Sequence, residues 1–304
     1  MEKIEDENKI KEQLLSRLRG EFPNLHFEAT TLITVGYDYN ILILDDRLIV
    51  RFVKTEDGNE RFKTEINFLH EFGPISNVKV PDYQWVSSDG SFGGYEMIGG
   101  KELTGEAYRE LEPEQHQAFV DDMATFLTRL HTFPSDQVES LGISAYNHEK
   151  VLQYATEWYR NKFLPRVGPT LGLDERDFVD SFMTGFGQSE ETFQPVLCHY
   201  DLSLNHVLMG ADGKVSGIID FGDVRMGDPA KDFVAFASLG DDTQKQIYEK
   251  YKDPKDPDFL KRCRELKTYD FLHHLYRVEK TDDEETKISA RKKLDKMMSV
   301  TEAV

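Results

Sequence analysis

Cysteine is scarce in this 304-residue sequence, which contains only Cys198 and Cys263. Two isolated cysteines supply neither a disulfide framework nor the Cys-x-x-Cys spacing of a zinc site, and they suit a reducing compartment. Long apolar runs are also missing, because an Asp-Asp-Arg triplet at 45–47 interrupts the most hydrophobic stretch, residues 40–53. The N-terminal MEKIEDENKIKEQ is charged from its second residue and lacks the apolar core of a secretory signal. We therefore expect a soluble cytoplasmic protein without a membrane-spanning segment.

Positive charge is also in short supply, since 37 Lys and Arg face 56 Asp and Glu, a formal net charge of −19. Nucleic acids and anionic membranes attract basic surfaces, so neither is expected as the main partner. A cationic ligand is compatible with this charge, and so is an acidic surface that only aids solubility. With 39% hydrophobic and 12% aromatic residues, the chain has the composition of a globular protein with a sizeable core.

The first third of the chain predicts a small, mostly antiparallel sheet with one inserted helix. Apolar residues recur there at helical spacing in two segments, and β-branched and aromatic residues cluster between turn signals in the others. The predicted elements are a helix over 3–18, strands before Gly36, near 39–44 and near 48–53, a helix over 60–72, and strands over 79–86 and 94–98.

After Gly99-Gly100 the sequence becomes mainly helical, and we place a boundary at this pair. The boundary divides the chain into an N-terminal lobe, 1–98, and a C-terminal lobe, 99–304. Pro113 stands where the first turn of a helix tolerates proline, ahead of an apolar stripe that ends near Leu130. Further helices are predicted over 154–164, 178–186, 243–251 and 259–280, and strands over 196–197 and 215–220.

Two acidic residues beside predicted strands suit phosphoryl transfer. Asp201 follows the strand at 196–197 within the segment His-Tyr-Asp-Leu-Ser-Leu-Asn-His that ends at His206, and Asp220 ends an apolar strand. One carboxylate can orient and deprotonate an attacking hydroxyl, while the other and a neighbouring ligand hold Mg²⁺ against the phosphates.

This segment resembles the catalytic loop of the aminoglycoside phosphotransferases, which are protein-kinase-like in fold. The match lies in the family's H-x-D-x-x-x-x-N and I-D-F-G motifs, and residues 227–233, GDPAKDF, are similar to its G-D-P-x-x-D-F segment. The resemblance implies that Asp201 is the catalytic base and that Asp220 binds the metal. His206 falls where most members have a metal-ligating Asn. A histidine at this position is similar to the aminoglycoside 2″-phosphotransferase branch and the related macrolide 2′-phosphotransferases. His199 and Asp232 are expected to support the loop structurally.

The same resemblance implies that the N-terminal lobe binds the nucleotide. The candidate phosphate loop, 34–38, contains one glycine, Gly36, and no G-x-G-x-x-G. In the strand that follows, the family's V-x-[RK]-F-x-[KR] pattern gives Arg51 the phosphate-contacting position, with Lys54 as the second candidate. Glu65, in the segment matching the family's N-E-x-x-x-L helix, is the expected partner of Arg51. The hinge that reads the purine is expected at Tyr95, Glu96, Met97 and Ile98.

The acceptor is expected to be a small molecule. Only a few residues separate Asp220-Phe-Gly222 from Gly227, so the long activation segment on which protein kinases dock peptides is missing. Acidic and aromatic residues suit a cationic acceptor, although each can equally be a solvated surface residue. The candidate substrate-binding residues are Asp241, Asp242, Tyr269, Asp270 and His273.

We therefore expect an α+β, bilobal protein-kinase-like fold with a small, mostly antiparallel sheet lobe and a larger helical lobe. The expected function is transfer of the γ-phosphoryl of ATP or GTP, with Mg²⁺, to a hydroxyl of an aminoglycoside, conferring antibiotic resistance. The alternatives are a macrolide 2′-phosphotransferase, a kinase of choline, homoserine or a sugar, and a kinase-like nucleotide-binding module without turnover. We expect a monomer or weak dimer.

Overall fold

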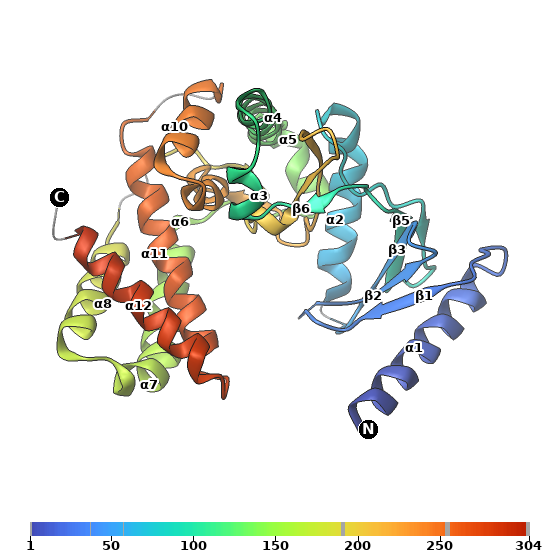
Figure 1. Ribbon diagram of the computed structural model, residues 1–304, viewed down its shortest axis with the longest axis horizontal. Helices are drawn as coiled ribbons and strands as arrows, with labels where there is room; N and C mark the ends of the chain where they lie inside the picture. Colours follow the sequence, from blue (N-terminus) through green and yellow to red (C-terminus); the bar gives the residue numbers. More distant parts are fainter. Residues whose placement is uncertain (1, 37, 57, 190–191, 253–255, 302–304) are drawn as a thin grey trace. The chain divides into compact units, whose positions relative to one another are not determined.

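The computed structural model describes residues 2–36, 38–56, 58–189, 192–252 and 256–301. The chain forms two compact units, each built from two segments of the sequence (Figure 1). The first unit comprises Met1–Ser144 and Val196–Asp253, and the second comprises Ala145–Pro195 and Pro254–Val304. Gly99 and Gly100 both lie in the first unit, and the lobe boundary at this pair stays a prediction.

The N-terminal sheet of the first unit is antiparallel throughout, as the sequence predicts. Its hairpin turn begins at Asp45 and Asp46, whose φ angles of 52° and 49° place both in the left-handed region. Aspartate tolerates that region better than most residues, and the Arg47 N–H donates to the Leu44 carbonyl at 3.0 Å to close the turn. The strand order is β1 (Thr30–Ile33), β2 (Tyr39–Leu44), β3 (Leu48–Val53), β5 (Phe92–Glu96) and β4 (Trp85–Val86).

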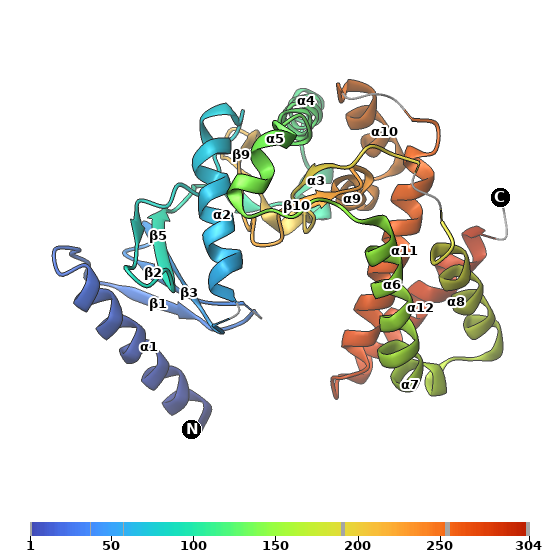
Figure 2. The ribbon, with the colours of Figure 1, turned by 180° about the vertical axis from the view of Figure 1, so that it is seen from behind.

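Helices α1 (Glu2–Glu21) and α2 (Gly58–Phe72) pack against this sheet (Figures 1 and 2). Alternation along β3 directs Val50 and Phe52 into a core cluster shared with leucines of α1, whereas Arg51 on the other face meets Glu65 of α2. The strand expected over 79–86 is limited to Trp85–Val86, because Pro81 has no N–H to donate to a ladder.

The rest of the first unit is built around helix α4 (Pro113–His131), which begins at Pro113 as expected and buries its apolar stripe. Gly217 permits a close approach, since a Cβ there would lie 2.6 Å from Ile98 Cγ2 and 2.8 Å from the Lys79 carbonyl oxygen. The remaining helices are α3 (Gly105–Arg109), α5 (Ser135–Val138), α9 (Ala230–Phe233) and α10 (Asp241–Lys250), with 3₁₀ turns at Gly73–Ile75, Glu139–Leu141, Leu204–His206 and Val234–Ser238.

Two small antiparallel sheets complete the first unit. In one, β7 (Val196–Cys198) pairs with β10 (Arg225–Gly227). In the other, the order is β6 (Lys101–Glu102), β8 (Val207–Met209) and β9 (Val215–Ile218). The loops after β7 and β9 carry the two acids singled out in the sequence.

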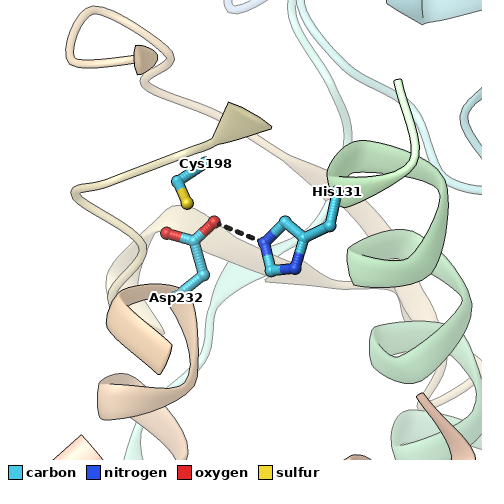
Figure 3. A group of neighbouring side chains, drawn as sticks. All are labelled: His131, Cys198 and Asp232. Carbon is cyan, nitrogen blue, oxygen red and sulfur yellow. Dashed lines mark hydrogen bonds and ion pairs between the residues drawn. The ribbon is translucent and has the colours of Figure 1, made fainter. Parts of the chain in front are cut away.

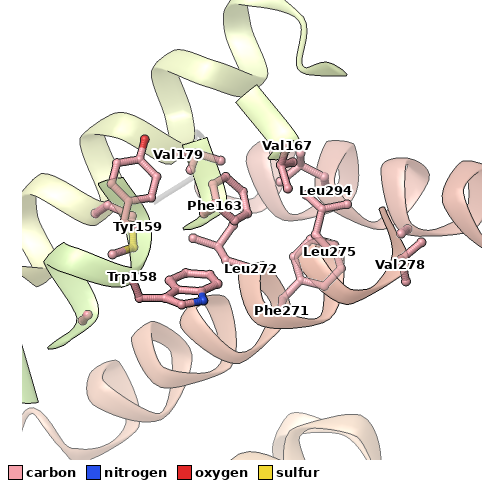
Figure 4. Close-up of a cluster of buried hydrophobic side chains, with 13 residues drawn as sticks. Trp158, Tyr159, Phe163, Val167, Val179, Phe271, Leu272, Leu275, Val278 and Leu294 are labelled. Carbon is pink, nitrogen blue, oxygen red and sulfur yellow. The ribbon is translucent and has the colours of Figure 1, made fainter. Parts of the chain in front are cut away.

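The second unit is helical and has its own apolar core (Figure 4). The charged segment after residue 282 forms an additional helix that the sequence analysis does not predict, and it buries Ala290 and Leu294 one turn apart. The elements are α6 (His148–Trp158), a π-helical turn (Tyr159–Phe163), α7 (Leu164–Val167), a 3₁₀ turn (Gly168–Thr170), α8 (Leu173–Phe186), α11 (Phe259–Val278) and α12 (Glu284–Thr301).

Among the described residues, no helix combines the length and the apolar character that a membrane crossing needs. Cys198 and Cys263 are both buried.

Candidate active site

The loop after β7 presents Asp201 through an unusual backbone turn. Tyr200 has a φ of 70°, a left-handed conformation that few residues with a side chain adopt. The Asp232 carboxylate holds this turn, because Oδ2 accepts the His199 N–H at 2.7 Å and Oδ1 accepts the Tyr200 N–H at 2.8 Å. Asp201, the residue after this turn, is exposed.

Asp232 is completely buried, and a second side chain stabilises its charge (Figure 3). His131 Nε2 donates to Asp232 Oδ2 at 3.1 Å, since a carboxylate can only accept, and the Tyr251 hydroxyl lies 2.7 Å from His131 Nδ1. Burial by itself raises the pKa of Asp232. The His131 hydrogen bond and charge, aided by the Tyr200 N–H, outweigh that effect and hold the pKa below its usual value.

His199 connects the two acidic loops. Its buried ring donates from Nε2 to the carbonyl oxygen of Ile219 at 3.0 Å, directly before Asp220. Burial lowers the pKa of His199, which favours the neutral imidazole that this single donor requires. The supporting roles expected of His199 and Asp232 fit these contacts.

The three residues expected to handle the proton and the metal lie together. Ligand atoms of Asp201, His206 and Asp220 are all within 4.8 Å of one another. His206 Nδ1 donates to the Asp201 carbonyl oxygen at 2.8 Å, and His206 Nε2 lies 3.5 Å from Asp220 Oδ2. A proton on Nδ1 leaves the Nε2 lone pair facing the carboxylates, which is the arrangement of a metal-ligating histidine.

The protein shifts the acid–base equilibrium of Asp201. Loss of contact with water is the main reason that the pKa of the Asp201 carboxyl rises above its usual value. His206 opposes the shift, whereas the negative charges of Asp223 and Asp220 add to it. A carboxylate with a raised pKa is a stronger base than a free aspartate, which suits proton abstraction from a hydroxyl.

Arg51 and Glu65 form a buried ion pair on the face of the N-terminal sheet that packs against α2. Arg51 is 4% exposed and Glu65 is fully buried, and Arg51 Nη1 donates to Glu65 Oε1 at 2.5 Å. Burial raises the pKa of the Glu65 carboxyl, and the charge of Arg51 opposes this rise. Arg51 Nη2 also reaches Asp220 Oδ1 at 3.0 Å, so this pair contacts the acidic cluster directly.

The loop expected to cover the phosphates is held by side chains rather than by a glycine-rich sequence. Lys54 Nζ donates to the carbonyl oxygens of Thr34 and Gly36, at 2.8 and 2.6 Å. Gly36 has a φ of 129°, which suits glycine, whereas Tyr37 lies outside the described residues. Lys54, the second phosphate candidate, therefore supports the loop in this structure.

Arg61 is a residue near the site that the sequence reasoning missed. From the first turn of α2, its guanidinium lies 3.4 Å from Asp38 Oδ1 and 3.3 Å from Asp223 Oδ1. It thus links the last residue of the candidate phosphate loop, Asp38, to the loop that follows Asp220. Its position one helical turn before Glu65 is the signal that could have indicated it.

The expected hinge follows β5. Tyr95 and Ile98 are buried, whereas Glu96 and Met97 are exposed. The Met97 N–H donates to the Arg47 carbonyl oxygen at 2.7 Å and is therefore engaged within the protein. A purine-reading role for Tyr95, Glu96, Met97 and Ile98 stays a prediction.

The residues expected to bind the acceptor fall in different units. Asp241 and Asp242 are exposed in the first turn of α10, in the first unit. Tyr269, Asp270 and His273 are half-buried on α11, in the second unit. There His273 stacks on Trp158 with ring centroids 3.7 Å apart, and Tyr269 stacks on Phe186 at 4.8 Å. Their roles in acceptor binding stay predictions.

Comparison with known protein families identifies the chain. Residues 30–262 match the family model described as the phosphotransferase enzyme family. The match spans most of the chain, so the protein belongs to this family and is a phosphotransferase, as the motifs around Asp201 and Asp220 predicted.

Curated relatives match much of the chain. The Bacillus subtilis (strain 168) protein named Uncharacterized protein YcbJ is 25% identical over 266 residues, which are 81% of this chain and 82% of that protein. An aminoglycoside 3′-phosphotransferase from Escherichia coli is 28% identical over 207 residues, which are 61% of this chain and 66% of that enzyme.

Solved structures confirm the kinase-like fold. A structure described as the GDP complex of wild-type aminoglycoside 2′-phosphotransferase-IIIa has a TM-score of 0.82 at 20% identity and covers 95% of this chain and 98% of that chain. One described as macrolide 2′-phosphotransferase type I has a TM-score of 0.70 at 19% identity, with 93% and 96% covered. The expected combination of an antiparallel sheet with a mainly helical remainder is therefore confirmed.

Proposed function

We propose that this phosphotransferase moves the γ-phosphoryl group of ATP or GTP to a hydroxyl of an aminoglycoside antibiotic and thereby confers resistance. The observation that carries the proposal is the grouping of Asp201, His206 and Asp220 beside the buried pair of Arg51 and Glu65. A base, a metal-binding acid and a fixed cation are the parts that phosphoryl transfer from a nucleoside triphosphate requires.

Asp201 is the group that receives the acceptor's proton. Its carboxylate is exposed, and its raised pKa makes it a better base than an ordinary aspartate. As the acceptor oxygen bonds to phosphorus and the bond to the leaving diphosphate breaks, Asp201 orients the hydroxyl and takes its proton. Arg51, held by Glu65, pairs with phosphate oxygens through its permanent positive charge.

Asp220 and His206 together also fit a Mg²⁺ ion. Asp220 provides the carboxylate oxygens that Mg²⁺ prefers, and His206 Nε2 is aimed at the same space with its other nitrogen donating to a carbonyl. When bound, Mg²⁺ neutralises charge on the phosphates. Because nitrogen is a poorer ligand for Mg²⁺ than oxygen, we assign the main contribution to Asp220 and a secondary one to His206.

Two observations favour a cationic acceptor. The formal net charge is −19, and Asp241 and Asp242 are exposed at the start of α10. Related proteins have been solved with such molecules, in structures described as a GDP and kanamycin complex and as a gentamicin complex. A macrolide is the second candidate, because a macrolide 2′-phosphotransferase also shares the fold over 93% of this chain.

A mixed acceptor panel tests the proposal. The purified full chain is incubated with Mg²⁺ and either ATP or GTP, together with aminoglycosides, macrolides, choline, homoserine and sugars. Mass spectrometry is expected to detect a phosphorylated aminoglycoside and release of ADP or GDP. Phosphorylation of a macrolide or metabolite alone would replace the proposed acceptor, and no acceptor-dependent nucleotide turnover would favour a binding module without activity.

A further inference from the structure

Tyr39 covers one face of Arg51 in a way that the reaction scheme above does not use. The Arg51 guanidinium carbon lies 3.9 Å from the centroid of the Tyr39 ring, within the range of a cation–π interaction. We propose that Tyr39 is a positioning residue that holds Arg51 for the phosphates of the nucleotide. This inference rests on the proposed function and extends it to a residue next to the phosphate loop.

The backbone gives Tyr39 a fixed origin. Tyr39 is the first residue of β2 and pairs with Val53 of β3, and the adjacent Lys54 N–H donates to the Asp38 carbonyl oxygen at 2.8 Å. Its ring also lies 5.6 Å from the ring of Phe62 on α2. The side chain therefore projects from the end of the phosphate loop onto the ion pair between the sheet and α2.

Hydrogen bonds from two tyrosine hydroxyls surround the Arg51–Glu65 ion pair. The Tyr39 hydroxyl donates to Glu65 Oε2 at 3.3 Å, while Glu65 Oε1 accepts from Arg51. The Tyr83 hydroxyl lies 3.1 Å from Arg51 Nη1 and 3.4 Å from Glu65 Oε1. Burial is the main cause of the raised pKa of Tyr39, so its phenol stays protonated and able to donate.

These contacts leave Arg51 with a defined direction of approach for an anion. Tyr39 covers a face, and Glu65 and Tyr83 engage Nη1, whereas Nη2 points to Asp220 Oδ1. A phosphate oxygen can therefore meet Arg51 on the Nη2 side, beside Asp220. Removing the Tyr39 ring leaves one face of the guanidinium without its contact, so Arg51 gains side-chain freedom that is lost when a nucleotide binds.

Calorimetric titration tests this role, with separate variants that remove the Tyr39 ring and the Tyr39 hydroxyl. The full chain and its variants Tyr39→Leu and Tyr39→Phe are titrated with ADP and GDP in the presence of Mg²⁺. The affinities for adenosine and guanosine are measured by competition with these diphosphates. Tyr39→Leu is expected to weaken nucleoside diphosphate binding about tenfold, within the range of a desolvated cation–π contact. Nucleoside binding is expected to change less than about threefold, because nucleosides lack the phosphates that Arg51 would contact.

The conservative variant and a matched control separate positioning from general stability. Tyr39→Phe keeps the ring and is expected to bind within about threefold of the wild type. Tyr159→Phe removes another tyrosine hydroxyl that donates to a carboxylate, that of Asp180 in the second unit, and is expected to leave nucleotide affinity unchanged. If Tyr39→Leu does not fold, Tyr39→Met, which fills the space with a flexible side chain, carries the same expectation.

Each outcome bears on one proposal. Wild-type diphosphate affinity in folded Tyr39→Leu or Tyr39→Met overturns the positioning role, as do equal losses for diphosphates and nucleosides. A loss in Tyr39→Phe as large as that in Tyr39→Leu would assign the effect to the hydroxyl and overturn the role of the ring. A wild-type chain that binds neither diphosphate would instead contradict the proposed function.

Discussion

The buried Arg51–Glu65 pair and the accessible acids Asp201 and Asp220 are held in position in different ways. The Arg51 and Glu65 side chains are 5% and 0% exposed, enclosed by aromatic rings and fixed by burial. Asp201 and Asp220 remain accessible, and their positions come from the backbone, since Tyr200 and Asp220 have φ angles of 70° and 69°. Burial can fix a permanent cation through its partner, whereas a base that exchanges protons with a substrate must remain reachable. The four predictions that follow test this contrast.

Replacing Asp201, the proposed base, is expected to have the largest effect. Asp201→Asn keeps the size of the side chain and removes the proton acceptor, so kcat is expected to fall by about 10²- to 10⁴-fold. Nucleotide affinity, measured by calorimetry, is expected to change little because Arg51 and Asp220 are untouched. Asp136→Asn, which alters an exposed acid of α5, is the matched control. Wild-type turnover in Asp201→Asn would remove Asp201 from its assigned role.

Breaking the enclosed pair is expected to affect folding more than chemistry. Glu65→Ala leaves the buried Arg51 charge without its 2.5 Å partner and is expected to cost about 3–5 kcal/mol of unfolding free energy. Arg61→Ala, which removes half-exposed ion pairs on the same helix, is expected to cost about 1 kcal/mol or less. Chemical denaturation measures both values. Similar losses in the two variants would contradict the role assigned to burial.

The carboxylate that holds the catalytic turn is expected to link stability to acidity. The pKa of Asp232 is below its usual value in the folded state, so its stabilising contribution is complete above the unfolded-state value, about 3.9, and is lost as the pH falls below it. Asp232→Asn is expected to lower stability near neutrality by about 1–3 kcal/mol and to flatten the loss of stability between about pH 5 and pH 3. Thermal unfolding over that range measures the slope, and an unchanged slope would contradict this account.

The smallest expected effect is a shift in the pH–rate profile. Because burial raises the pKa of Asp201, the acidic limb of kcat/KM is expected to lie above the ordinary aspartate value of about 3.9. Asp223→Asn removes one of the negative charges that raise this pKa, so the limb is expected to move to lower pH. Initial rates at saturating Mg²⁺ measure the limb. A shift to higher pH in Asp223→Asn would contradict the electrostatic assignment.

Local sequence signals predicted most of the longer strands and helices and the acids of the site, whereas β6, β8 and β10 were not predicted. Richness in β-branched and aromatic residues between turn signals indicated β2 and β3, and the motif spacing around Asp201 and Asp220 indicated phosphoryl transfer before any geometry was known. Helix α12 was missed because its many charges conceal the two positions, Ala290 and Leu294, that pack into the second unit. Charged residues on a helix indicate solvent only when its apolar positions are too few to form a stripe.

The residues missed around the site share a physical reason. Arg61 belongs to no short motif, and Tyr39 and Arg61 each act on groups that are distant in sequence, such as Arg51 for Tyr39 and Asp223 for Arg61. Lys54 was a candidate for the phosphates, but its contacts with Thr34 and Gly36 explain how a loop with one glycine is held. Pairings of this kind depend on how the chain folds back on itself, which spacing alone does not encode.

The sequence by itself determined the chemistry available to this protein: two acids after short strands, a cation on the third strand and a strong excess of negative charge. Only the tertiary structure decided the burial, the orientation and the pKa values of those groups. It buried the partner of Arg51, placed His206 Nε2 toward Asp220, and raised the pKa of Asp201. Side-chain identity is local, whereas burial, hydrogen-bond partners and electric field arise from segments that meet only after folding.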